Sequence, residues 1–94
     1  MPRMNRILNV TVTPADAWQK VFDATAYKGN RVREVRIKLR ESSTADHFRY
    51  NYDGSASVYM TSTAGVITVR DIQKLYVFVP TVDSQVLELE LIYK

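Results

Sequence analysis

The side chains that most often perform catalysis are few in this chain. The sequence has a single histidine, His47, and no cysteine. A histidine that acts as a general base needs a nucleophile and an orienting acid within hydrogen-bond reach. Ser42, Ser43 and Asp46 lie just before it, but neighbours in sequence do not by themselves form a catalytic triad. We therefore interpret His47 as a solvent-facing histidine at the edge of a loop, and we expect no enzymatic activity.

Metal and phosphate sites are not indicated either. His47 with Asp46 and Asp53 lacks the spacing of a known set of metal ligands. The three glycines are isolated from one another, whereas a loop that cradles phosphate needs clustered glycines. Because the chain has no cysteine, disulfides, thiolate nucleophiles and cysteine-based zinc sites are excluded. We expect no cofactor, no metal and no small-molecule substrate.

A row of cations is the strongest candidate for a binding surface. Arg36, Lys38 and Arg40 alternate with apolar residues, and alternate side chains of a strand stand about 7 Å apart on one face. Such a row can meet an acidic protein surface or successive phosphates. Charged residues are also common on strands that simply face solvent. These three interpretations stay open, and the three cations are our candidate residues for partner binding.

Aromatic residues form a second candidate surface. Tyr76 and Phe78 occupy one face of a predicted strand, and the other face carries Leu75, Val77 and Val79. With both faces apolar, the strand is either covered on both sides or meets another subunit. Trp18 belongs to the residue type most enriched at the centres of interfaces, with a core position as its alternative. We predict an oligomer interface at Trp18, Tyr76 and Phe78.

Two further binding hypotheses rest on aromatic residues. Phe48, Tyr50 and Tyr52 share one face of a predicted strand, where they form either part of the core or a platform on which bases stack. Combined with the cation row, that platform would make the chain a nucleic-acid-binding β-barrel. A third, weaker hypothesis is a carbohydrate-binding sandwich with Trp18 and Tyr27 as its platform.

Short strands are the elements that must position these residues. Alternation of apolar and polar residues predicts strands at 7–12, 31–40, 47–52, 58–61, 66–69, 75–79 and 86–93. Residues 13–22 are ambiguous. Thr13, Pro14 and Asp16 have the form of a helix start, while Trp18 and Phe22 would share one face of a strand at 17–22. We favour the strand, because an otherwise all-β chain tends to override weak local propensity.

Eight short strands in 94 residues predict an all-β protein, either an antiparallel β-sandwich of jelly-roll-like form or a small barrel. We expect one domain at residues 7–94, preceded by an N-terminal arm at residues 1–6. Apolar residues make up 46% of the chain, and no apolar run approaches the roughly 20 residues that span a bilayer. We therefore expect a soluble protein made in the cytoplasm and no membrane association.

The net charge of +3 is unevenly distributed. Residues 28–49 carry seven cations and three acids, whereas residues 50–94 carry three cations and five acids. We therefore expect one basic face and one mildly acidic face on the folded molecule.

The second half of the chain resembles a known type of protein. The segments concerned are Val58-Tyr59-Met60-Thr61, Ala64-Gly65-Val66-Ile67-Thr68-Val69, Lys74-Leu75-Tyr76-Val77-Phe78-Val79 and Val86-Leu87-Glu88-Leu89. Together they are similar to the C-terminal pattern of small all-β virion proteins of tailed bacteriophages. The polar turn at residues 81–85 departs from that pattern, because it lacks the usual glycine.

The resemblance implies a capsid decoration or cement protein, or a related head-fibre component. It implies a dimer or trimer that sits on the major capsid protein, or on another virion protein, at the capsid surface. In that setting Trp18, Tyr76 and Phe78 would make subunit contacts, and Arg36, Lys38 and Arg40 would meet an acidic capsid surface. Nucleic acid is not an expected partner.

Overall fold

The computed structural model describes residues 5–27, 32–40, 44–63 and 65–93, which contain eight strands and one short 3-10 helix. The strands are β1 (Arg6–Val12), β2 (Gln19–Asp23), β3 (Val32–Leu39), β4 (Phe48–Asn51), β5 (Met60–Ser62), β6 (Ile67–Arg70), β7 (Lys74–Phe78) and β8 (Gln85–Tyr93). The 3-10 helix η1 (Ala24–Tyr27) follows β2 directly. In the described part of the chain, no helix has the length and apolar character needed to cross a membrane.

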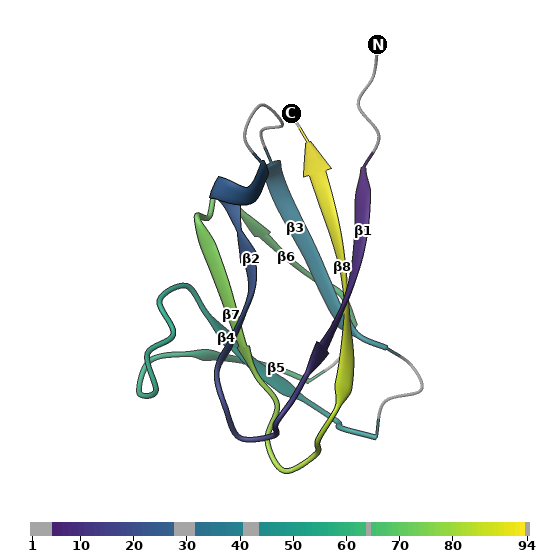
Figure 1. Ribbon diagram of the computed structural model, residues 1–94, viewed down its shortest axis with the longest axis vertical. Coiled ribbons are helices and arrows are strands. Elements are labelled where there is room, and N and C mark those ends of the chain that lie inside the picture. The colour runs from purple at the N-terminus through teal and green to yellow at the C-terminus, as the bar shows by residue number, and fades with distance from the viewer. Residues whose placement is uncertain (1–4, 28–31, 41–43, 64, 94) are drawn as a thin grey trace.

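The strands form two four-stranded sheets that face each other (Figure 1). One, here called the β8 sheet, has the order β1-β8-β3-β6, and the other, the β7 sheet, has the order β2-β7-β4-β5. Four of the antiparallel pairs follow the hairpin order, β1 with β8, β2 with β7, β3 with β6, and β4 with β5. The pairs β3 with β8 and β4 with β7, also antiparallel, join them into the two sheets. The chain is thus one long hairpin whose successive strand pairs alternate between two sheets. This is a jelly-roll sandwich, so the predicted antiparallel β-sandwich is confirmed.

The core lies between the sheets and follows the predicted alternation. In β8, Leu87, Leu89 and Leu91 are buried, while Glu88 and Glu90 between them remain partly exposed. The opposite sheet contributes the buried side chains of Phe22, Phe48, Leu75, Val77 and Val79. Strands such as β8 therefore bury one face in the core, and the other face points away from the sandwich.

The ambiguous segment forms a strand rather than a helix. β2 begins at Gln19 and pairs with β7, and a β-bulge between Lys20 and Phe22 allows Val21 and Phe22 both to be buried. The preceding residues form a loop in which the backbone N–H of Asp16 donates to the carbonyl oxygen of Val79 at 3.0 Å. The possible helix at residues 14–22 is therefore not formed, because pairing with β7 satisfies the backbone instead.

At the N-terminus, the first strand begins one residue earlier than the alternation predicts. Arg6 already pairs with Leu91 of β8. Residues 1–4 of the predicted N-terminal arm lie outside the described residues, as does Ala64 of the predicted Ala-Gly turn.

The turn from β2 into η1 is held by one carboxylate. Lys20 Nζ donates to Asp23 at 2.8 Å, and the N–H and Oγ1 of Thr25 donate to it at 3.0 and 2.7 Å. The hydrogen bond from Lys20 and the two from Thr25 hold the pKa of Asp23 well below its usual value. A depressed pKa contributes stability above the unfolded-state value of about 4, and this contribution is lost as the pH falls below it.

We expect the Asp23→Asn variant to lose less stability on acidification than the wild type. The measurement is the thermal midpoint of both proteins between about pH 6 and pH 2, a window that brackets the unfolded-state pKa. Parallel pH profiles would show that the Asp23 carboxylate contributes nothing to the acid sensitivity of the fold.

Candidate functional site

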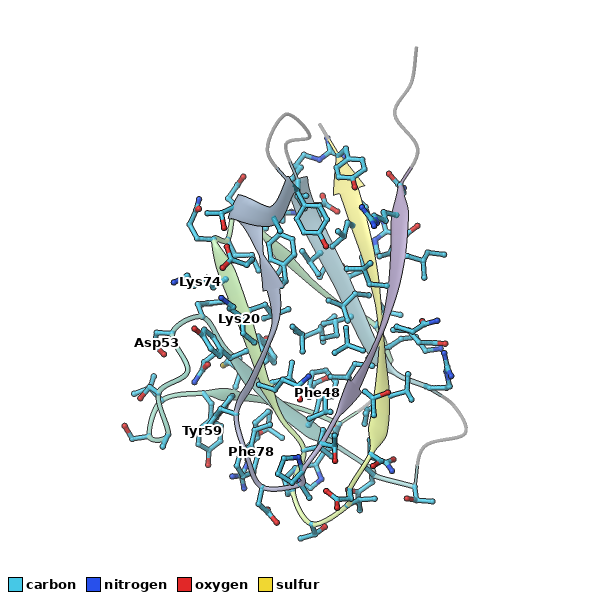
Figure 2. All side chains as sticks on the ribbon, in the orientation of Figure 1. Lys20, Phe48, Asp53, Tyr59, Lys74 and Phe78 are labelled. Carbon is cyan, nitrogen blue, oxygen red and sulfur yellow. The ribbon has the colours of Figure 1, made fainter. Side chains whose placement is uncertain are left out.

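Three aromatic side chains and one arginine cluster on the outer face of the β7 sheet. The ring centroid of Trp18 lies 5.3 Å from that of Phe78 and 6.0 Å from that of Tyr59. The guanidinium carbon of Arg49 lies 4.7 Å from the centre of the Tyr59 ring and 5.1 Å from that of Phe78. We call Trp18, Arg49, Tyr59 and Phe78 the aromatic surface. Figure 2 labels Tyr59 and Phe78, which lie near each other at one end of the β7 sheet.

Strand register explains why these residues meet. Leu75, Val77 and Val79 of the β7 region point into the core, so Phe78 points outward. Arg49 of β4 is the register partner of Phe78, which places its side chain beside the ring on the same face. A guanidinium within about 6 Å of a ring centre is attracted by the negative face of the ring. The arginine therefore contacts both rings and attracts each of them.

Tyr59 reaches the cluster from the loop between β4 and β5. The buried amide of Asn51 donates to the carbonyl oxygens of Ser55 at 2.7 Å and Val58 at 3.0 Å, and accepts from the N–H of Gly54 at 3.0 Å. One side chain thus fixes three points of the loop. The residue that follows the second carbonyl is Tyr59, so Asn51 sets where that ring lies.

The same loop lies against Tyr76. Gly54 has a φ of +76°, and a Cβ at this position would lie 3.2 Å from the Tyr76 ring. A side chain here would be strained by its φ and would also press on the ring. Of the three residues predicted to form an oligomer interface, Trp18 and Phe78 belong to the aromatic surface. Tyr76 lies on the same face of β7 as Phe78, but the chain's own loop contacts it.

The residues on either side of Tyr59 in the sequence are apolar and exposed. Val58 and Met60 flank Tyr59 and are 70% and 62% exposed, and Tyr59 itself is 39% exposed. Met60 is the register partner of Tyr50, so its side chain lies on the opposite face of the strand from Arg49 and Tyr59. The aromatic surface therefore resembles a protein interaction site through its tryptophan, tyrosine and arginine, the residue types enriched at interface hot spots.

The predicted cation row lies on the outer face of the other sheet and is paired with acids. Arg36 lies 3.5 Å from Glu90, and Glu88 lies 3.9 Å from Lys38 and 3.2 Å from Arg40. These five residues, which we call the charged face, combine three cations with two carboxylates. The expectation of separate basic and acidic faces is wrong here, because β8 brings acids from the end of the chain beside β3.

His47 has a local carboxylate partner. Its Nδ1 lies 2.6 Å from Asp46 Oδ1, and this hydrogen bond lowers the pKa of Asp46. Asp53 instead accepts from the N–H of Ser55 at 2.9 Å in its own loop. Within the described ranges, no group of three or more potential ligands is placed to hold a metal ion. Ser42 and Ser43 lie outside those ranges.

The other two aromatic platforms are not assembled as open surfaces. Phe48 is only 2% exposed and Tyr50 packs against the core, so only Tyr52, at 50% exposure, is open to solvent. Phe48 and Tyr50 therefore follow the first of the two alternatives, a place in the core. The row offers no continuous stack for bases. Tyr27 stacks on Phe22 after the far end of β2, away from Trp18, which precedes that strand.

Arg49 and Tyr59 are site residues that sequence reasoning did not single out. Arg49 alternates with Phe48 and Tyr50, so its outward direction can be predicted from the sequence. The residue beside it on β7 cannot be predicted in this way.

No protein-family model, curated protein or solved structure matches this chain.

Proposed function

We propose that the chain is a structural virion protein, a capsid decoration or cement protein that binds the major capsid protein and stabilises the head. The observation that carries this proposal is the aromatic surface: three neighbouring rings, two of them in contact with Arg49, on the outer face of the β7 sheet. The jelly roll is consistent with it, since viral capsid domains are among the proteins that use this fold. The resemblance of the second half to phage virion proteins supplies the rest.

The composition of the aromatic surface suits protein binding. Tryptophan, tyrosine and arginine dominate the residues that contribute most to interface affinity. The rings are already arranged by contacts within the chain, so binding orders few additional side chains, and this lowers its entropic cost. A small sandwich also gains stability from occupancy, because a ligand that binds only the folded state shifts the folding equilibrium toward it.

The nucleic-acid alternative has less support. It needs exposed stacking aromatics and a free cation row, whereas Phe48 is buried and the cations of the charged face lie beside Glu88 and Glu90. An oligonucleotide complex whose affinity falls steeply with salt would favour that alternative over the proposal.

We expect the Trp18→Ala variant to bind assembled capsids of its source virus at least about 30-fold more weakly than the wild type, the loss typical of an interface hot spot. Co-sedimentation with capsids measures the affinity. Tyr52→Ala is the matched control, because Tyr52 is an exposed aromatic residue outside the aromatic surface. Its affinity should equal that of the wild type.

Two outcomes would overturn the proposal. One is a wild-type protein, folded by circular dichroism, that does not sediment with capsids. The other is equal capsid binding by Trp18→Ala and the wild type, since the aromatic surface would then not be the contact.

A further inference from the structure

The outer face of the β8 sheet is arranged in columns of distinct chemistry. Its four strands lie in the order β1-β8-β3-β6, and the register places Ile7, Glu90, Arg36 and Thr68 in one row across them. In the next row outward along the strands, Asn9, Glu88 and Lys38 are aligned. In these two rows β8 contributes the acids and β3 the bases, and β1 and β6 form the two rims of the face.

Both rims carry an exposed apolar side chain. Ile7 of β1 is 70% exposed, and Val66, directly before β6, is 56% exposed. Between them lies an open groove of about 610 Å³, lined by these two residues and by the ion pairs of Arg36 with Glu90 and Lys38 with Glu88. At the centre of this face two acids lie beside two bases, and each margin carries an apolar side chain. Such a face suits a partner that places bases opposite the acids of β8 and acids opposite the bases of β3.

We propose that the partner is a second copy of this chain, docked face to face about a two-fold axis that runs parallel to β3 and β8 and between them. Rotation about this axis reverses the order of the columns while keeping each row at its height along the strands. The acidic β8 of one copy then lies opposite the basic β3 of the other. Glu90 faces the partner's Arg36, Glu88 faces the partner's Lys38, and the reciprocal contacts follow from the symmetry.

The other face-to-face two-fold does not give this match. An axis in the same plane but perpendicular to the strands keeps the order of the columns, so acidic β8 would face acidic β8 and basic β3 would face basic β3. Like charges placed opposite each other are destabilising. The pattern of charge therefore selects one symmetry among the two.

The same rotation covers both exposed apolar side chains. β1 of one copy comes to lie opposite β6 of the other, so Ile7 faces Thr68 of the second copy. Val66 precedes Thr68 by two residues, about 7 Å along a strand, so it comes to lie nearer the partner's Asn9 than the partner's Ile7. Aligned sheets that pack about 10 Å apart leave room for the arginine and glutamate side chains to meet.

The extent of the face predicts a weak, reversible dimer. Four strands spaced about 4.8 Å apart and up to about 30 Å long give two faces that together bury on the order of 1,000 Å². That area is at the lower end for specific complexes. The inference does not depend on capsid binding, because the aromatic surface lies on the opposite side of the sandwich.

An exchange of charges tests the symmetry directly. The single variants Arg36→Glu and Glu90→Arg each place like charges opposite each other across the interface, and each should raise the dimer dissociation constant at least about tenfold. The double variant R36E/E90R restores the ion pair within the chain and also the contacts between copies, so it should dimerise as the wild type does. Sedimentation equilibrium from micromolar to millimolar protein provides these constants.

Mixing gives the more specific result. In a dimer of wild type with R36E/E90R, Glu90 would face the introduced glutamate and Arg36 the introduced arginine. The two proteins should therefore each self-associate but form few mixed dimers. Because the exchange leaves the composition and mass unchanged, one protein is labelled uniformly with ¹⁵N, and native mass spectrometry then distinguishes mixed from like dimers. Trp18→Ala should dimerise normally, and this separates self-association from capsid binding. A wild type that stays monomeric to millimolar concentration, or free mixing of the two proteins, would overturn the proposal.

Discussion

The Leu89→Ala variant is expected to lose about 2–5 kcal/mol of unfolding free energy, the range for truncating a buried leucine. Leu89 is 1% exposed and lies in β8, the strand that joins β1 to β3. Its register neighbours, Leu8 and Ile37, point to the same side, and Leu89 belongs to the buried core, so the removed methyl groups leave a cavity there. A domain of this size has roughly 5–15 kcal/mol in total, so one truncation removes a large share.

Chemical denaturation of the two proteins measures the difference. Val58→Ala is the matched control, because it removes methyl groups from a side chain that is 70% exposed. Its effect should stay within about 0.5 kcal/mol. Equal losses in both variants would mean that Leu89 is not enclosed between the sheets.

Local alternation predicts most of the fold. The strict period of two in β8, with Leu87, Leu89 and Leu91 on one side, is a property of neighbouring residues and needs no knowledge of the rest of the chain. The same holds for β3 and β7. Which strands lie side by side is different, because pairing of β1 with β8 joins residues some 80 positions apart, and nothing local distinguishes this partner from another strand of similar composition.

Residues 13–22 illustrate where local signals end. Thr13, Pro14 and Asp16 have the form of a helix start, whereas Trp18 and Phe22 would share one face of a strand, so the local signals conflict. The strand forms because β7 offers an unpaired edge and because the bulge in β2 buries Val21 and Phe22 together. Tertiary pairing, which outweighs weak propensity, therefore decides the outcome.

The candidate site was predictable in part. Residue type and strand face identify Trp18 and Phe78, and the structure brings both to the aromatic surface. Arg49 and Tyr59 join them only through the register of β4 with β7 and through the fold of one loop. The cation row was identified correctly as an outward face, but its neutralisation by Glu88 and Glu90 depends on the pairing of β3 with β8. Long-range register thus determines the chemistry of both faces.

The Asn51→Asp variant is expected to be destabilised by about 2–4 kcal/mol, because the carbonyl groups of Ser55 and Val58 lose their donor and a charged group enters a buried position. The wild-type amide donates to Ser55 and Val58, whereas a carboxylate would present an oxygen to each carbonyl. Desolvation and these carbonyls would raise the pKa of the introduced carboxyl in the folded state. A raised pKa favours the protonated form on folding, so the deficit relative to the wild type should shrink as the pH falls below that pKa.

The Asn51→Ala variant separates the loss of donors from the added charge. It should also be destabilised, yet its deficit should not vary with pH, since it introduces no titratable group. Trp18 fluorescence reports the loop in both variants, because displacement of Tyr59 removes an aromatic neighbour at 6.0 Å. If both variants kept the wild-type emission and bound capsids normally, Asn51 would not position Tyr59, and the aromatic surface would have to be held by Arg49 and Phe78 alone.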